Sequence, residues 1–326
     1  MIKRFALVTT TLAVLATFAT AAIASGRNSR HGHHAGRPGL ALDAAPVQVL
    51  QWNQELQKVL VAPGAQPASI HPTRTLAITQ IAIYDAVNGI LGGGQPLLVD
   101  LRGPRSASPD AAAAAAARAT LDALLPSQQP TIDAFFQSSL AQIGSGERVE
   151  RGIRFGTSVA EAVLAARAND GASATPPVFT PGTGPGEYQL TPPAFAPAGF
   201  TQTSHVTPFV LGSPSQFRPA PPPSLTSAGY AAAFNEVKSL GELNSTSRTA
   251  DQTAIGNFWG AAPIWIVWNQ IADQAALGSG NGLEQNARLF AQLNTTLADS
   301  AIALYDAKYA LHRWRPITAI TAPDQG

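Results

Sequence analysis

Apolar side chains recur every three or four positions along most of this 326-residue chain, which is the spacing of one helix face. No segment alternates apolar and polar residues beside turn residues, as a half-buried strand would. We therefore expect an all-α fold whose helices pack as bundles. The segments with helical spacing are 43–62, 73–91, 109–125, 127–143, 146–168, 227–240, 247–259, 263–277 and a long one from about 282 to Arg315, before Pro316.

The segment 171–227 interrupts this pattern, because 13 of the 26 prolines fall within its 57 residues. A helix interior or a central strand does not tolerate prolines at this density. Disordered segments usually lack large apolar residues, whereas this one contains Phe179, Tyr188, Phe195, Phe200, Phe209, Phe217 and Leu225. We expect an ordered loop that wraps over the helices rather than a linker between two domains.

The first 24 residues have the composition of an export signal. Lys3 and Arg4 precede an apolar stretch to about Thr20, and Ala22-Ile23-Ala24 offers a small-residue cleavage site. A membrane anchor is the less favoured alternative, because the stretch is short for a bilayer span. We expect a signal peptide at 1–24, a flexible linker at 25–40, a helical domain at 41–326, and an exported protein without a membrane segment after cleavage.

Composition narrows the chemistry that the chain can carry. The absence of cysteine excludes disulfides and every metal site that needs thiolate ligands. A formal net charge of +1 gives no basic footprint for binding nucleic acid. We assign no metal-ligating residue from the sequence, and the oligomeric state is not indicated.

The informative polar residues lie at the end of the last predicted helix. Lys308 and Arg315 are seven positions apart, so on a continuous helix they project about 20° apart around the axis. His312 shares or borders that face. An oxyanion is the natural complement of two such cations, since Arg binds it bidentately and Lys adds a compact charge. Spacing alone also fits a pair of surface cations favoured by the helix macrodipole.

Other titratable residues have weaker claims to a role in the site. Asp85 and Asp306 each occur in a Tyr-Asp-Ala sequence within a predicted helix. They are candidates for pairing with buried cations, and no general-acid role can be argued for them. His71 and His205 are single histidines in loop-like surroundings, where we expect structural roles.

Lys308-x6-Arg315-Pro316 matches the first signature of the type-2 phosphatidic acid phosphatase superfamily, and its surroundings resemble the bacterial vanadium-dependent haloperoxidase branch. The resemblance implies the N-terminal part of a helical haloperoxidase fold. It also implies that both cations donate to bound vanadate, or to phosphate in phosphatase relatives. Peroxide, a halide and an organic acceptor would be the small-molecule partners. The resembling segments include ITQIAIYDAVNGI at 78–90, TPPAFAP at 191–197, STSRTADQTAIGNFW at 245–259, and residues 206–241 and 283–320.

Relatives complete this site with a Pro-Ser-Gly-His segment and a Ser-Arg…His segment, which supply an acid–base histidine and an axial vanadium ligand. We identify neither in this chain, and His312 lies inside the first signature. We therefore assign no catalytic residue, treat His312 as a neighbour of the site, and expect the domain to be incomplete at its C-terminus and inactive alone. A haloperoxidase-like protein, an acid phosphatase of the same superfamily, and a non-catalytic scaffold that binds an oxyanion remain open.

Overall fold

The structure is a computed structural model that describes residues 47–322. The predicted signal peptide, the predicted linker and both ends of the predicted domain lie outside the described residues. Within 47–322 the chain forms ten α-helices, two short 3₁₀ helices and no strand, beyond one antiparallel bridge between Glu187 and Arg313. The expected all-α fold is confirmed for these residues. None of their helices combines the length and hydrophobicity of a bilayer span.

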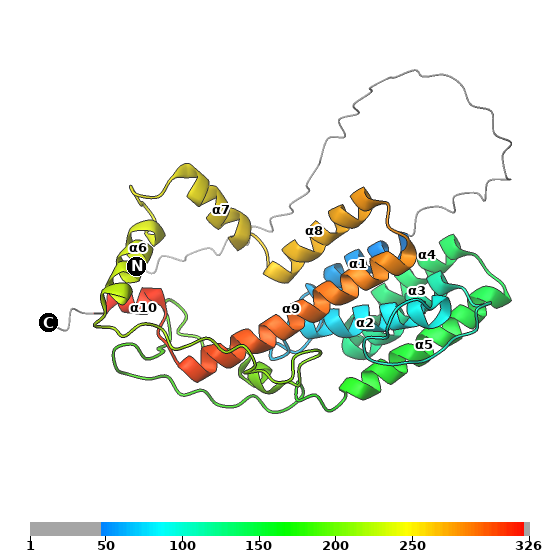
Figure 1. Cartoon of the computed structure of the whole chain (residues 1–326), viewed down its shortest axis with the longest axis horizontal. Coiled ribbons are helices and arrows are strands. Elements are labelled where there is room, and N and C mark those ends of the chain that lie inside the picture. Colours follow the sequence, from blue (N-terminus) through cyan, green and yellow to red (C-terminus); the bar gives the residue numbers. More distant parts are fainter. Residues whose placement is uncertain (1–46, 323–326) are drawn as a thin grey trace, which may run out of the picture. The chain divides into compact units, whose positions relative to one another are not determined.

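The helices before the Pro-rich loop form the core bundle together with α9. α2 is its central element, because 17 of its 20 residues are buried. Figure 1 shows α9 running beside α2, with which it shares an extensive contact. The helices of the core bundle are α1 (Val47–Leu60), α2 (Pro72–Leu91), α3 (Pro109–Leu124), η1 (Pro126–Gln128), α4 (Gln129–Ile143), α5 (Glu147–Arg167) and α9 (Leu283–Leu311).

Small residues set the closest helix contact of the core bundle. The seven alanines at 111–117 are all buried, and Ala111 and Ala112 lie against Gly152 and Gly156 of α5. A Cβ built on Gly156 of α5 would lie 2.1 Å from the backbone oxygen of Ala112. The two backbones can therefore approach this closely only because position 156 has no side chain.

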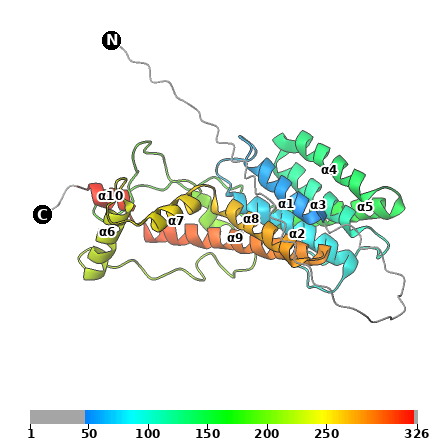
Figure 2. The same ribbon diagram turned by 90° about the horizontal axis from the view of Figure 1, so that it is seen from above.

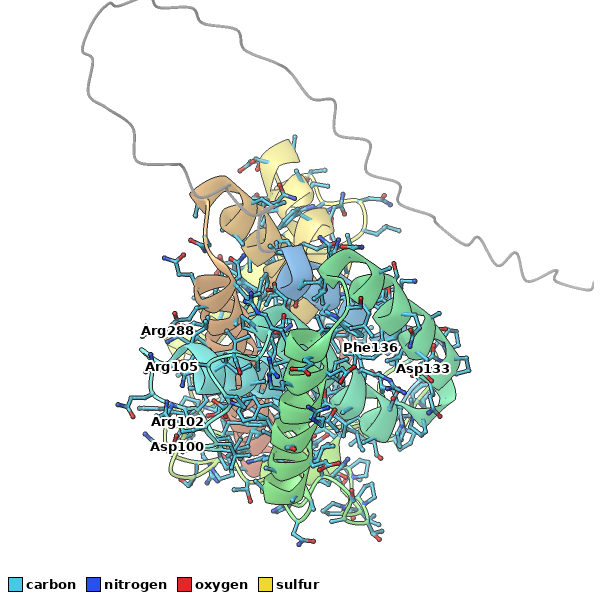
Figure 3. The ribbon with its side chains drawn as sticks, turned by 90° about the vertical axis from the view of Figure 1, so that its right-hand side faces the viewer. Asp100, Arg102, Arg105, Asp133, Phe136 and Arg288 are labelled. Carbon is cyan, nitrogen blue, oxygen red and sulfur yellow. The ribbon has the colours of Figure 1, made fainter. Side chains whose placement is uncertain are left out.

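Polar contacts join other helices of the core bundle. Figure 3 shows Asp133 and Phe136 on α4, where Arg118 of α3 donates to Asp133 over 2.6 Å and lies 5.0 Å from the Phe136 ring centroid. Deeper inside, Asn269 of α8 (Ile264–Ser279) and Asn294 of α9 each donate to the other's side-chain oxygen, over 2.8 and 2.9 Å. This reciprocal amide pair satisfies two buried side chains at once and fixes the register of α8 on α9.

The chain after residue 227 also forms helices, but three of them bury no residue. These are α6 (Ala228–Gly241), α7 (Ala250–Gly260) and α10 (Pro316–Thr321). α6 and α10 lie side by side (Figure 2). α7 begins with Thr249 and Gln252 in a capping box, in which each side chain accepts the other's backbone N–H. Local capping, rather than burial, therefore determines where α7 starts.

The Pro-rich loop is ordered, as expected. The buried carboxylate of Asp299 on α9 accepts the backbone N–H groups of Phe209, Val210 and Leu211 over 2.6, 2.8 and 2.9 Å. Arg167 at the end of α5 donates to the carbonyl oxygens of Thr207 and Pro208. These bonds fasten the middle of the loop to the core bundle, next to the short helix η2 (Thr201–His205).

Asp85 performs the same task inside the core bundle. Its carboxylate accepts the backbone N–H groups of Leu97, Leu98 and Val99 over 2.7, 3.0 and 2.9 Å. The prediction that Asp85 pairs with a cation is therefore wrong. Three amide donors replace the cation and hold the connection between α2 and α3.

Candidate functional site

Lys308 lies in the last turn of α9 and is half-buried between two tyrosines. Its ammonium nitrogen is 5.0 Å from the ring centroid of Tyr305 and 5.3 Å from that of Tyr309. No carboxylate or hydrogen-bond acceptor within residues 47–322 contacts this nitrogen. Burial, and next the charge of Arg315, lower the pKa of Lys308. Among the described residues, the close partners of this cation are therefore aromatic faces.

Both tyrosines remain neutral and cannot compensate this charge. Burial raises the pKa of Tyr305, and burial together with Tyr305 and Tyr188 raises the pKa of Tyr309 to about 12. The two rings stack with their centroids 6.0 Å apart, and the Tyr309 hydroxyl donates to the carbonyl oxygen of Gly199. The pair shields one side of Lys308 from water and ties α9 to the Pro-rich loop.

Arg315 is near Lys308, but a turn rather than a continuous helix brings it there. α9 ends at Leu311, and His312 adopts a left-handed conformation with φ 51° and ψ 36°. Arg315 has an extended backbone with φ −81° and ψ 156°, and Pro316 begins α10. The prediction of a helix through Arg315 is wrong, because the left-handed His312 ends α9 and Pro316 disfavours the helical conformation at Arg315.

The Pro-rich loop holds this turn through backbone pairing. Tyr188 N–H donates to the carbonyl oxygen of His312 over 2.8 Å, and Trp314 N–H donates to that of Gly186 over 3.0 Å. The guanidinium of Arg313 donates to the carbonyl oxygen of Pro223 over 2.7 Å. The position of Arg315 relative to Lys308 therefore depends on two stretches of the loop.

His312 lies at the site as a structural neighbour. Its Nε2 is 3.1 Å from the carbonyl oxygen of Thr180, and its ring centroid is 4.6 Å from that of Phe179. A contact with a carbonyl oxygen requires a hydrogen on Nε2, so this nitrogen donates. The left-handed backbone directs the ring towards the loop instead of the helix face on which the sequence placed it.

Asp306 precedes Lys308 by two positions in the sequence, but its carboxylate is already paired with Arg218. The guanidinium of Arg218 donates to both carboxylate oxygens, each over 2.7 Å. The prediction that Asp306 pairs with a cation is confirmed, although Arg218 is half-exposed. Because this bidentate pair leaves Asp306 engaged, it does not neutralise Lys308.

His71 and His205 have structural contacts, and the His71 ring centroid lies 5.5 Å from that of Tyr305. His71 caps α2 by accepting the backbone N–H of Thr73, and burial lowers its pKa to about 4. His205 closes the short helix η2. Within residues 47–322, no three His, Asp or Glu side chains gather as a metal-binding group. The arrangement can hold an oxyanion by charge and N–H donors, and it places no acid–base group against it.

Sequence reasoning missed the partners that shape this site. Tyr305 precedes Lys308 by three positions and Tyr309 follows it directly, so helical spacing could have placed Tyr305 beside the ammonium group. Arg218 gave no such signal, because it lies 88 positions from Asp306 in an irregular segment.

Comparisons with known proteins give matches only among solved structures, since no family model and no curated protein matches. A bacterial vanadium-dependent iodoperoxidase superposes with a TM-score of 0.74 at 21% identity, over 86% of this chain and 73% of that one. A holo-type bacterial vanadium-dependent chloroperoxidase superposes with a TM-score of 0.61 at 17% identity, over 86% of this chain and 70% of that one. An apo-type bacterial vanadium-dependent chloroperoxidase superposes with a TM-score of 0.59 at 15% identity, over 79% of this chain and 65% of that one.

The chain has the fold of the bacterial vanadium-dependent haloperoxidases. The fold that the sequence resemblance implied is thereby confirmed over most of the chain. The haloperoxidase fold explains the arrangement of the helices, while the chemistry of this chain rests on its own residues.

Proposed function

We propose that this chain supplies the oxyanion-binding cations of an exported, vanadium-dependent haloperoxidase-like enzyme. One observation carries the proposal: Lys308 and Arg315 lie close together in a haloperoxidase fold, and neither side chain makes a hydrogen bond or ion pair with residues 47–322. A half-buried ammonium without a counter-charge, beside an exposed guanidinium, favours an anion. The export part of the proposal rests on residues 1–24.

The donors present fit an oxyanion such as vanadate. The Lys308 ammonium offers three N–H donors and the Arg315 guanidinium offers five, and such donors suit the oxygens of an anion. Bound vanadate supplies activation of peroxide for the oxidation of halide. The role of this chain's residues is to bind and orient the anion, while Tyr305 and Tyr309 exclude water from one side of Lys308.

A titration of the purified chain with orthovanadate, followed by calorimetry and ⁵¹V NMR, tests the proposal. Removing one charge-assisted contact removes about 1.5–3 kcal/mol of binding free energy, so Lys308→Ala and Arg315→Ala should each weaken binding by at least roughly tenfold. Lys58→Ala is the matched control, because Lys58 is exposed and paired with Glu55 on α1. Equal vanadate affinity in the wild-type chain and in both site variants would refute the proposal. Phosphate as competitor reports whether the site distinguishes the two oxyanions.

A further inference from the structure

Three polar side chains near the end of α9 make no hydrogen bond or ion pair with the residues that the structure describes, namely those of Tyr305, Lys308 and Arg315. Every other polar side chain from 305 to 315 has such a partner elsewhere in the chain; these are Asp306, Tyr309, His312, Arg313 and Trp314. The Tyr305 hydroxyl is thus the one neutral group of this segment that residues 47–322 leave without a partner.

The Tyr305 hydroxyl lies with the two cations. Tyr305 precedes Lys308 by three positions, so both side chains project from the same face of α9, and the ammonium nitrogen is 5.0 Å from the tyrosine ring centroid. Burial raises the pKa of Tyr305 and the charge of Arg315 opposes that rise, while burial and then Arg315 lower the pKa of Lys308. Arg315 acts on both groups because it is close to both.

The ring of Tyr305 is held in place by three neighbouring rings. Its centroid is 5.5 Å from those of His71 and Phe200 and 6.0 Å from that of Tyr309. His71 caps α2 in the core bundle, and Phe200 precedes η2 in the Pro-rich loop. The hydroxyl oxygen nevertheless remains accessible to solvent. A ligand can therefore reach a hydroxyl group that is already oriented, which lowers the entropy lost on binding.

The chemistry of this hydroxyl suits an anion that two cations already attract. Because burial raises its pKa, the phenol keeps its hydrogen at neutral pH and can donate it to an anionic oxygen. A neutral donor also adds no repulsion to the pair of positive charges, whereas a third cation would. Phenylalanine would make the same ring contacts, so packing alone does not account for the hydroxyl.

We propose that Tyr305 is a third anion-binding residue of this site, whose hydroxyl donates a hydrogen bond to an oxygen of the oxyanion held by Lys308 and Arg315. The inference deepens the proposed function and rests on it, since it adds a neutral donor to the two cations. It concerns the hydroxyl group alone, because the contact between the ring and the ammonium group does not need it.

Tyr305→Phe tests the inference, since it removes the hydroxyl and retains the ring. In a calorimetric titration of the purified chain with orthovanadate, the variant should bind about fivefold more weakly or worse, the effect of one hydrogen bond to a charged group. Tyr188→Phe is the matched control. The Tyr188 hydroxyl also lacks a hydrogen-bond partner among residues 47–322, but its ring contacts Phe179 and His312 rather than Lys308. This variant should bind vanadate as tightly as the wild-type chain.

A second measurement uses the chain without substitution at the site. Labelling with [¹³Cζ]tyrosine reports all five tyrosines by NMR, and the signals missing from Tyr305→Phe and Tyr188→Phe assign these two residues. Saturating vanadate should move the Tyr305 signal, because its hydroxyl becomes a donor, and leave that of Tyr188 in place.

The outcomes separate this inference from the proposed function. Unchanged vanadate affinity in Tyr305→Phe, or a Tyr305 signal that does not move at saturation, would overturn the inference alone, because binding by Lys308 and Arg315 would stand. A wild-type chain that does not bind vanadate would overturn both. Weaker binding by Tyr305→Phe together with a moved Tyr305 signal would establish the hydroxyl as a ligand of the anion.

Discussion

The core bundle and the helices around the site are built in opposite ways. In α2 nearly every residue is buried, whereas α6, α7 and α10 bury none. α9 belongs to both regions, because its first half is buried in the core bundle and its last turn carries Lys308. Hydrophobic burial therefore stabilises one region, while turns, caps and loop contacts position the cations in the other.

The same Gly→Ala change should have opposite effects in the two regions. Gly156→Ala forces a Cβ against backbone atoms of Ala112 that cannot rotate away, 2.1 Å from its oxygen. We expect the free energy of unfolding to fall by about 3 kcal/mol. Gly256→Ala in the middle of α7 meets no atom within 4 Å, so it should stabilise that helix by about 0.5–1 kcal/mol.

Urea unfolding of both variants, with amide exchange in α7, measures this pair of effects. A destabilisation of similar size in both would show that α7 is as closely packed as α5. The opposed signs would establish that the two regions differ in packing and not in helix propensity.

Asp299 and Asp85, whose carboxylates each accept three backbone N–H groups, give the next comparison. Asp299→Ala leaves the N–H groups of residues 209–211 without their acceptor, which costs about 2–3 kcal/mol. We expect hydrogen exchange at those amides to accelerate by roughly 50-fold, with a smaller change in global stability. Asp85→Ala should instead lower global stability, because residues 97–99 connect two helices of the core bundle. If Asp299→Ala lowered global stability as much as Asp85→Ala, the Pro-rich loop would belong to the same cooperative unit as the core bundle.

A further effect concerns the pH dependence of stability at the contact between α1 and α8. Asp273 accepts from Asn53 Nδ2 over 3.0 Å, and Gln80 Nε2 donates to Asn53 Oδ1 over 2.9 Å. Burial raises the pKa of Asp273 from 3.8 to about 6, so the folded chain binds more protons than the unfolded chain between these values. This group therefore lowers stability as pH rises from about 4 through 6.

Asp273→Asn keeps the size and an acceptor oxygen while removing the charge. The variant should be more stable than the wild-type chain by about 1–2 kcal/mol above pH 7, with no advantage below pH 4. Thermal unfolding at pH 4, 6 and 8 tests this, and a constant difference across the series would contradict the titration of Asp273.

Helical spacing predicted the core bundle well, because burial repeats along each helix and is visible in the sequence. Most predicted bounds lie within a few residues of the observed ones. The end of α9 was wrong, although the steric effect of Pro316 on Arg315 was readable from the sequence. The left-handed His312 and the bidentate Arg218–Asp306 pair could not be predicted, since both depend on contacts with the irregular loop.

The length of α9, 29 residues, separates Lys308 from the contact between α9 and α8. The reciprocal side-chain hydrogen bonds of Asn269 and Asn294 hold α9 at Asn294. At a rise of about 1.5 Å per residue, Asn294 is about 21 Å from Lys308 along the helix. A rigid rod pivoting there by about 3° displaces its far end by about 1 Å, and a misplacement of that size can cost about a hundredfold in a reacting site. A small angular error in the interior would therefore reach the cation magnified, unless the loop contacts of Asp306 and Tyr309 resist it.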